Sequence, residues 1–250
     1  MCWSILVPLT PTAISAECSD FDSDGLTDCE ETSIHHTDPY VADSDGDGYL
    51  DGEEVENKYS PLANHSTKLV DLDTDEDGLN DDWEIRLGSD LMNPDTDGDG
   101  YKDGDELDNS YSPTNPQAIL GEKKIEVNAD LQSLTYYFND IALDDFLIST
   151  GRPNTPTPMG EFKVLAKVPS KNYGGPGYSF SFPNTLWNLH FTTDYWRYYI
   201  HGAYWHKNFG QQMSSGCVNV HYDNMENLYN FADIGTKILI FDSTNIAKLL

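Results

Sequence analysis

Basic residues are scarce in this 250-residue sequence, which holds 14 Lys and Arg against 43 Asp and Glu. No stretch forms a basic patch, so nucleic acid is excluded as a partner. The imbalance lies in one half: residues 1–120 carry 31 acidic and 4 basic residues, whereas residues 121–250 carry 12 and 10. Carboxylates at this density repel one another, so the first half is expected to need cations.

A long apolar run is also missing. The apolar stretch near the start, CWSILVPLTPTAISA, is too short for a spanning helix and is interrupted by two prolines. It ends in small residues before Glu17, which is typical of a signal peptide, although no Lys or Arg precedes it. Residues 1–16 are therefore predicted to be a truncated signal peptide; a disordered leader or a first strand is the alternative. The mature chain would have no transmembrane segment and would be extracytoplasmic, in the periplasm, in the cell wall or secreted.

Cysteine is the third scarce residue, with four in the chain. Cys2 would leave with the signal peptide. Cys18 and Cys29 flank one acidic loop and could pair, as in an exported protein. Cys217 is the one cysteine in the last 220 residues and is left as a free thiol. A buried structural thiol is the plain interpretation of such a residue.

The acidic half contains four windows that fit the pattern D-x-D-x-D-G-x-x-D-x-x-E. Alternate Asp side chains, the carbonyl at position 7 and the Glu at position 12 supply the oxygens that Ca²⁺ prefers, and the Gly at position 6 permits the turn. A disordered acidic linker would not keep Gly and Glu in register. The predicted calcium ligands are Asp20, Asp22, Asp24, Leu26, Asp28 and Glu31; Asp43, Asp45, Asp47, Tyr49, Asp51 and Glu54; Asp73, Asp75, Asp77, Leu79, Asp81 and Glu84; and Asp95, Asp97, Asp99, Tyr101, Asp103 and Glu106.

These windows do not predict EF-hands, because the segments that enter them are short and are broken by Pro39 and Pro94. The linkers instead resemble thrombospondin type 3 repeats, as in the stretch NPDTDGDG at residues 93–100. That resemblance implies an irregular, loop-rich array in which calcium ions replace a hydrophobic core. We assign residues 17–118 to this array.

Residues 119–250 have the pattern of a mostly β domain. Strands are expected at residues 124–127, 133–138, 145–151, 163–166 and 237–241. A short helix is expected after a capping box formed by Asp223 and Glu226, with apolar residues at helical spacing and an end at Gly235.

Within this half, Cys217 follows Ser-Ser-Gly, and His201 lies sixteen positions upstream after an aromatic, strand-like run. Two neighbouring strands could bring the thiol and the imidazole together, and a histidine can act as base for a thiol nucleophile. The N–H groups of Gly216 and Cys217 could then face an oxyanion. A zinc site from His201, His206 and Cys217 is the alternative, but no further ligand lies nearby.

The segment from His201-Gly202 to Ser214-Ser215-Gly216-Cys217-Val218-Asn219 resembles the signature of the L,D-transpeptidase catalytic domain, also called YkuD. The stretch TPMGEF at residues 157–162 resembles another motif of that family. Ser215 departs from the His that many members have there. The resemblance implies a YkuD-like β-sandwich with one or two short helices. It also implies Cys217 as nucleophile, His201 as base, Gly202 as the orienting carbonyl and Gly216 as an oxyanion donor. The implied substrate-binding residues are Ser214, Ser215, Asn219, Tyr204, Trp205 and His206.

The implied partner is the peptidoglycan stem peptide, either cross-linked 3→3 or trimmed, with structural Ca²⁺ and no catalytic cofactor. A non-enzymatic calcium-dependent adhesion or wall-binding protein, with a retired catalytic domain, is the alternative. The sequence leaves the oligomeric state open.

Overall fold

We describe residues 18–64, 66–174, 180–193 and 197–245 of a computed structural model of the chain. The predicted signal peptide lies outside these residues. The chain divides into two compact units between Leu72 and Asp73. Across the described ranges, no helix is both long and apolar enough to cross a bilayer.

The first unit holds the first two acidic loops and the short turns of helix that follow them. Its elements are α1 (Asp28–Glu30), the π-helical turn η1 (Glu31–His35), α2 (Asp51–Glu56) and the 3-10 turn η2 (Leu69–Asp71). A disulfide joins Cys18 and Cys29 across the first loop, so the pairing that the sequence allowed is present. The loop is thus closed covalently as well as by its hydrogen bonds.

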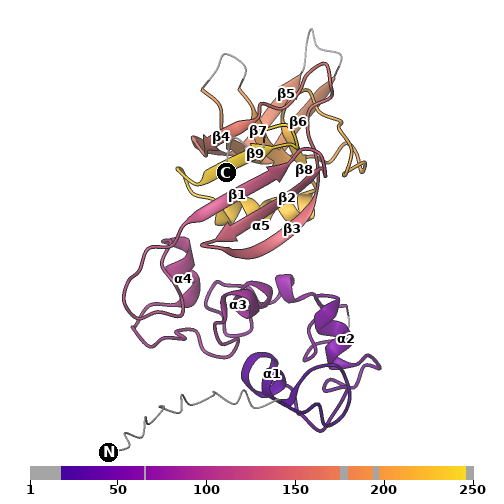
Figure 1. The fold of residues 1–250 in the computed structure, drawn as a ribbon, viewed down its shortest axis with the longest axis vertical. Coiled ribbons are helices and arrows are strands. Elements are labelled where there is room, and N and C mark those ends of the chain that lie inside the picture. Colours follow the sequence, from indigo (N-terminus) through magenta and orange to yellow (C-terminus); the bar gives the residue numbers. More distant parts are fainter. Residues whose placement is uncertain (1–17, 65, 175–179, 194–196, 246–250) are drawn as a thin grey trace, which may run out of the picture. The chain divides into compact units, whose positions relative to one another are not determined.

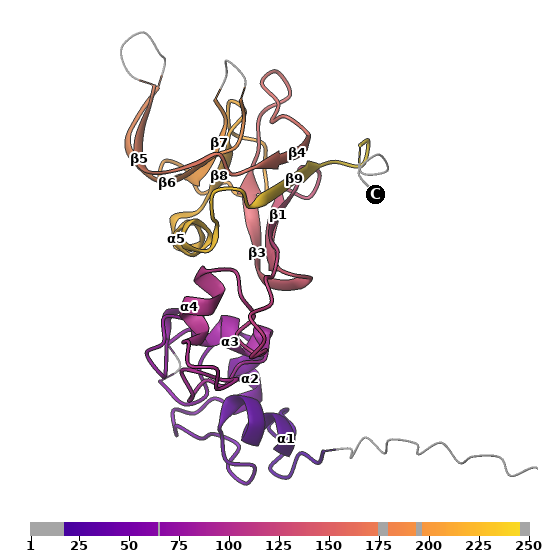
Figure 2. The ribbon, with the colours of Figure 1, turned by 90° about the vertical axis from the view of Figure 1, so that its left-hand side faces the viewer.

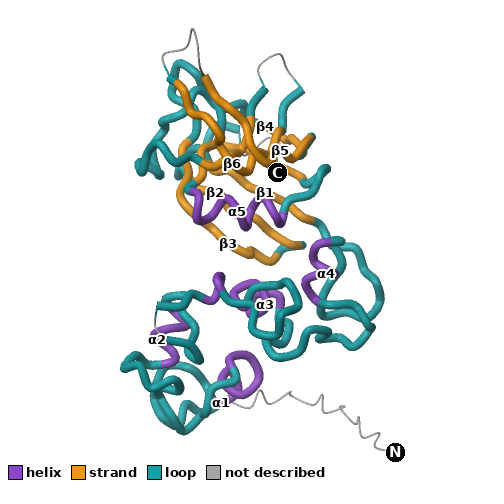
Figure 3. Tube along the Cα trace, turned by 180° about the vertical axis from the view of Figure 1, so that it is seen from behind, coloured by secondary structure: helices purple, strands orange, loops and turns teal. Residues whose placement is uncertain are grey.

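The second unit begins with the third and fourth loops, which are followed by α3 (Asp81–Leu87) and α4 (Asp103–Asp108). All four loops end in the same way, because each helix begins at the Asp in position 9. An acidic residue is favourable in the first turn of a helix, where it faces the positive end of the helix dipole. No α-helix enters any of these loops within the described chain, so they are not EF-hands (Figure 3).

The rest of the second unit is one curled sheet of nine strands in the order β4-β9-β1-β2-β3-β8-β7-β6-β5 (Figure 1). The fold is therefore mostly β, as the sequence predicts. The strands are β1 (Lys123–Asn128), β2 (Ser133–Phe138), β3 (Ile141–Ser149), β4 (Gly160–Lys163), β5 (Ala166–Gly174), β6 (Ser181–His190), β7 (Tyr199–Gly202), β8 (Val218–Val220) and β9 (Lys237–Phe241). Two neighbouring pairs, β1 with β9 and β7 with β8, are parallel.

The helix α5 (Tyr222–Phe231) packs on the sheet and supplies the centre of the core (Figure 2). Met225, Leu228 and Phe231 are fully buried and recur at helical spacing. The helix was expected, but its predicted capping box at Asp223 was wrong. The N-cap is His221, whose Nδ1 accepts from the Asp223 N–H, so the helix begins earlier; it ends at Phe231 rather than at Gly235.

Candidate active site and calcium loops

The pairing of β7 with β8 brings the predicted nucleophile and base to one place. The two strands are parallel neighbours, and His201 lies opposite Asn219. Cys217 precedes Asn219 by two residues and so lies on the same face of the strand. Cys217 and His201 both line one hollow of about 430 Å³. Two segments sixteen residues apart thus meet because their strands are adjacent.

Most of the predicted substrate-binding residues also line this hollow. The residues that line it are Arg152, Tyr173, Phe180, Phe182, His201, Trp205, His206, Met213, Ser214, Ser215, Cys217 and Asn219. Tyr204 is not among them, because its side chain is 49% exposed and its hydroxyl donates to the Pro183 carbonyl at 2.9 Å. The structure therefore does not bring Tyr204 to the hollow, unlike its neighbours Trp205 and His206.

The ring of His201 is held in one tautomer by its own backbone neighbour. Its Nδ1 lies 2.9 Å from the Gly202 carbonyl, and a carbonyl can only accept, so Nδ1 carries the proton. This leaves the Nε2 lone pair available as a base. The ring stacks on Tyr173, with centroids 4.5 Å apart and planes inclined by 28°. Burial lowers the pKa of His201 to about 4; the Gly202 hydrogen bond offsets part of this, and His206 adds to it.

The thiol has the opposite tendency. Burial raises the pKa of Cys217 to about 11, and the Tyr199 N–H and Lys171 offset only part of that rise. Between these two pKa values the pair is an uncharged thiol and an uncharged imidazole. Among the described contacts, the sulfur and the ring make no direct hydrogen bond. The thiol proton is thus still in place before a substrate binds, and His201 Nε2 is the candidate base to accept it.

This neutral pair predicts the pH dependence of alkylation. Because the thiolate is the nucleophile and the Cys217 pKa is about 11, we expect iodoacetamide to react about tenfold faster for each pH unit from 7 to 10. Intact mass spectrometry at timed intervals measures the rate, with Cys217→Ala as the blank. A rate that is already pH-independent at pH 7 would instead reveal a preformed ion pair of thiolate and imidazolium.

The turn before Cys217 is fixed by Ser214, which bonds to both sides of it. Ser214 Oγ donates to the Cys217 carbonyl and accepts the Gly216 N–H at 3.0 Å. The Gly216 N–H is thus engaged inside the turn. The predicted role of Gly216 as an oxyanion donor would require its N–H to leave this hydrogen bond to Ser214 Oγ, and the Cys217 N–H is the second candidate donor.

Gly216 has a different structural requirement. Its φ is +116°, and a Cβ there would lie 2.2 Å from the Tyr198 ring. Any side chain at this position would push the thiol out of place.

His206 and Asn219 form a second polar pair in the hollow, since the Asn219 amide lies 3.1 Å from His206 Nε2. Burial lowers the pKa of His206, so it too is neutral near pH 7. This contact joins the loop after β7 to strand β8 and so fixes one wall of the hollow.

Several residues that line the hollow were not predicted from the sequence. Tyr173 lies next to the end of β5, stacks on His201 and donates to Asn188 Oδ1 at 2.9 Å. Burial, then the nearby Cys217, raises the pKa of Tyr173 well above its usual value. Phe182 stacks on Trp205 with centroids 3.9 Å apart. The alternating residues of β5 and β6 could have indicated strands, but not the face that they line.

Arg152 was also missed. It follows β3, and its backbone N–H donates to the Ser214 carbonyl at 3.1 Å, which fixes it beside the cysteine turn. It is the one lining residue with a permanent positive charge. An anionic group on a ligand would meet this charge.

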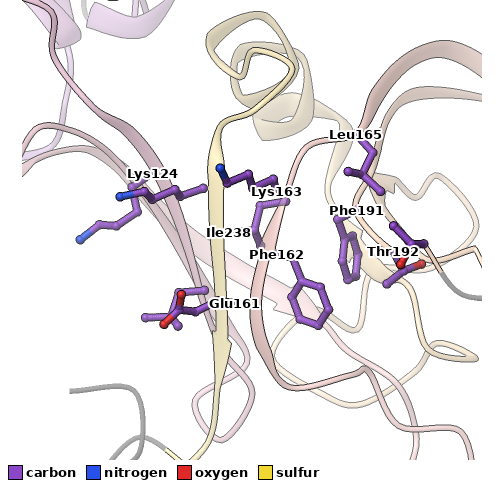
Figure 4. Close-up of a pocket in the computed structure, with 11 residues that line it drawn as sticks. Lys124, Glu161, Phe162, Lys163, Leu165, Phe191, Thr192 and Ile238 are labelled. Atoms are coloured by element: carbon purple, nitrogen blue, oxygen red, sulfur yellow. The ribbon is translucent and has the colours of Figure 1, made fainter.

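A larger hollow of about 750 Å³ lies elsewhere in the second unit, around β4 and β9 (Figure 4). The Phe162 and Phe191 rings meet there edge to face at 5.3 Å, and Lys124, Lys163 and Lys237 also line it. Among the described residues that line it there is no cysteine and no histidine, so this hollow lacks the thiol and imidazole found in the smaller one. Size therefore does not identify the candidate active site; the chemistry of the side chains does.

Three of the predicted ligands lie close together in each acidic loop. In each loop the carboxylates at positions 1, 3 and 5 have oxygen atoms within 4.8 Å of one another. The Glu at position 12 is buried in all four loops. One or both carboxylate oxygens of Glu31, Glu54, Glu84 and Glu106 are buried without a hydrogen-bond partner. Buried orphan oxygens fit a cation that binds between them.

Position 9 has a further contact that the pattern alone did not predict. The Asp51, Asp81 and Asp103 carboxylates each accept the backbone N–H and the hydroxyl of position 2, at 2.6 to 2.9 Å. Asp28 accepts the N–H of Phe21 in the same way. These side chains therefore close the loop, and Asp51 also lies within 4.8 Å of Asp24 and Glu31 of the preceding loop.

The loops are packed in pairs, the first with the second and the third with the fourth. In the second unit the Gly104 N–H donates to Asp77 Oδ2 at 3.0 Å, and Lys102 donates to the Glu76 carbonyl at 2.7 Å. A Cβ on Gly104 would lie 2.7 Å from the Asp77 carbonyl oxygen, so only glycine permits this approach. The carboxylate clusters of the third and fourth loops therefore belong to one packed body.

Comparison with known families finds a match in each half of the chain. Residues 122–240 match the model of the L,D-transpeptidase catalytic domain, and residues 20–42, 43–57, 73–90 and 95–109 match the bacterial TSP3 repeat. The putative L,D-transpeptidase YqjB of Bacillus subtilis is 25% identical over 52% of this chain and 77% of its own length. The putative L,D-transpeptidase YkuD of the same species is 28% identical over 46% of this chain and 64% of its own length.

Two solved structures are among those that match part of this chain. An L,D-transpeptidase from Mycobacterium smegmatis is 25% identical, with a TM-score of 0.45 over 49% of this chain and 59% of that one. The avibactam carbamoyl enzyme of Ldtfm is 27% identical, with a TM-score of 0.44 over 51% and 52%. The matched region thus spans between half and two thirds of these solved chains.

Proposed function

Because residues 122–240 are an L,D-transpeptidase catalytic domain that follows bacterial TSP3 repeats, we propose that this chain acts on peptidoglycan stem peptides through a thioester on Cys217. The observation that carries the proposal is the meeting of one free thiol and one tautomer-fixed imidazole in a hollow lined by aromatic residues. Such a hollow suits an extended peptide of mixed polarity.

The reaction begins when the Cys217 sulfur attacks the carbonyl carbon of the L-centred residue. The thiol proton passes to His201 Nε2, and the carbonyl oxygen becomes an oxyanion near the Cys217 N–H. The carbon–nitrogen bond then breaks, and the leaving D-residue takes the proton from His201 as its amine forms. An amine of a second stem resolves the thioester and gives a 3→3 cross-link; water gives a trimmed stem instead.

Arg152 has a place in this proposal. The departing D-residue bears a free carboxylate, and Arg152 supplies the permanent positive charge at the edge of the hollow. A guanidinium can hold a carboxylate in a two-pronged contact, which would orient the peptide bond toward Cys217.

The four acidic loops are proposed to bind structural Ca²⁺. The support is the clustering of carboxylates, the buried orphan oxygens of the position-12 Glu residues and the match to the repeat family. Such loops suit a calcium-rich exterior. The Cys18–Cys29 disulfide suits an oxidising compartment, which the exterior also is. We therefore propose that the chain is exported and works outside the cytoplasm.

The test of the activity uses a purified disaccharide-tetrapeptide as substrate. We expect the protein in calcium-containing buffer to release the terminal D-residue and to yield 3→3 dimers, trimmed tripeptides or both, resolved by mass spectrometry. A disaccharide-pentapeptide is the control substrate, because its additional residue moves the carboxylate away from Arg152. A folded protein that releases no D-residue from the tetrapeptide would contradict the proposal.

A further inference from the structure

The third and fourth acidic loops share a hydrophobic core with the catalytic sheet. Leu79, Trp83, Leu87 and Leu107 come from the loops and from α3 and α4, and all four are buried. They belong to one cluster with the residues of the sheet and of α5. The repeats of the second unit are therefore not separated from the catalytic fold by solvent.

Trp83 is the centre of this contact. Its ring lies edge-on to Tyr136 of β2 at 5.9 Å and to Phe231 of α5 at 6.0 Å. It is 8% exposed, and Tyr136 and Phe231 are fully buried. Edge-to-face packing of this kind is favourable beyond the area it removes from water. Without Trp83, the Tyr136 and Phe231 rings would lose their cover.

Polar contacts hold the same interface in register. Arg86 of α3 donates to the Ala142 carbonyl of β3 at 3.3 Å, while Asp82 holds the guanidinium at 3.1 Å. On the other side, Lys123 of β1 donates to the Asp108 carbonyl of α4 at 3.3 Å and pairs with Asp233 at 2.7 Å. The Lys123 side chain is only 3% exposed, so its charge depends on these partners.

Trp83 is placed by a helix that the third loop holds. It lies between Asp81, whose carboxylate closes the loop on Thr74, and Glu84, the buried position-12 residue. Glu84 has an oxygen without a partner and lies among Asp75, Asp77, Asp81 and Asp103. When these carboxylates are ionised and no cation is bound, their repulsion acts directly on α3. The helix that covers the catalytic core is thus built on the metal ligands.

We propose that the third and fourth loops, with calcium bound, are a structural part of the catalytic domain, and that the surface made by Tyr136, Phe231 and the Ala142 carbonyl is their docking surface. This inference rests on the proposed calcium binding but not on the proposed reaction. Loss of calcium from these loops would loosen β2 and α5.

The experiment is hydrogen exchange of the full-length chain, followed by mass spectrometry of peptides that cover residues 133–138 and 222–231. Calcium binding is measured in parallel by titration calorimetry. We expect chelation to speed exchange in both peptides by roughly a hundredfold, which is the order expected when a buried aromatic contact is lost. Trp83→Ala should give the same fast hydrogen exchange even in the presence of calcium, whereas Trp83→Phe should keep most of the protection from exchange.

Two Glu variants supply the matched comparison. Glu84→Gln removes a ligand charge from the third loop and also relieves the repulsion there, so the variant should fold, and the protection of the two peptides should become insensitive to calcium. Glu54→Gln makes the same change in the other compact unit and should leave that sensitivity in place.

The outcomes separate the two proposals. Calcium binding with unchanged exchange in both peptides would overturn the docking inference and leave calcium binding intact. Equal loss of sensitivity in Glu84→Gln and Glu54→Gln would also overturn it, because the effect would then be common to the whole array. A chain that binds no calcium would overturn both.

Discussion

Replacing Cys217 with Ser should abolish covalent capture of a carbapenem such as imipenem. The wild-type chain is expected to gain the mass of one molecule of the drug, because the thiolate that forms during attack opens the strained lactam as it would a peptide carbonyl. A serine hydroxyl is a much weaker acid and a weaker nucleophile than a thiol, so His201 would activate it far less in this position. We expect the rate of adduct formation to fall on the order of 10⁴-fold or more.

The two histidines should differ in the same assay. His201 presents a free Nε2 in a fixed tautomer, so His201→Ala should lose on the order of 10² to 10⁴ in rate, which is the usual contribution of a general base. His206 is hydrogen-bonded to Asn219 and lies in the loop after β7, so His206→Ala should keep a measurable rate of adduct formation. Lys163→Ala, at the larger hollow, is the control and should acylate normally. Equal loss in both histidine variants would show that the base has been assigned too narrowly.

Removing calcium should cause the largest change in stability. A ligand present at roughly a thousand times its Kd stabilises the fold by about 4 kcal/mol. For a chain of this size that corresponds to about 10 °C in melting temperature. Scanning calorimetry with and without a chelator whose calcium affinity depends little on pH, such as BAPTA, measures it. Equal melting temperatures in both samples would exclude a structural role for the ion.

The chelated protein should also respond to pH in an unusual direction. Burial, with the neighbouring carboxylates, raises the pKa of Glu84 to about 9 and those of Glu31, Glu54 and Glu106 to about 7. A carboxyl whose pKa is raised by folding stabilises the fold below its unfolded pKa, and that contribution is lost as pH rises through the folded value. The metal-free protein should therefore lose stability from about pH 5 to 9. The calcium-loaded protein should change little over the same range, and Glu84→Gln should flatten the upper part of the chelated curve.

The parts of the fold that the sequence could predict are those with a strict local pattern. The loops were predictable because Gly and Glu recur at fixed positions relative to three Asp residues. The strand around Tyr136 was predictable because polar and apolar residues largely alternate there, and the strand around Ile238 because a short apolar run follows Gly235. His201 and Cys217 could be placed together because each borders a strand-like run, although the parallel pairing of β7 with β8 required the coordinates.

Other features depend on neighbours that are distant in sequence. Tyr173 covers His201 only because β5 pairs with β6 and β6 pairs with β7. Leu79, Trp83 and Leu87 recur every four residues, which is a helical apolar stripe inside an acidic array. That stripe was the available signal that part of the array packs on a core, and the surrounding charge concealed it.

The position of Trp83 between two metal ligands also bears on when the protein becomes competent. A chain held in a compartment poor in calcium would keep α3 strained by its own carboxylates, with the Tyr136 and Phe231 rings partly uncovered. Secretion routes that carry extended polypeptides favour a chain that does not mature early. If the chain is exported as proposed, arrival in calcium-rich surroundings would complete the folding of the transpeptidase half. The cell would then meet an active enzyme only on the side of the membrane where its wall is built.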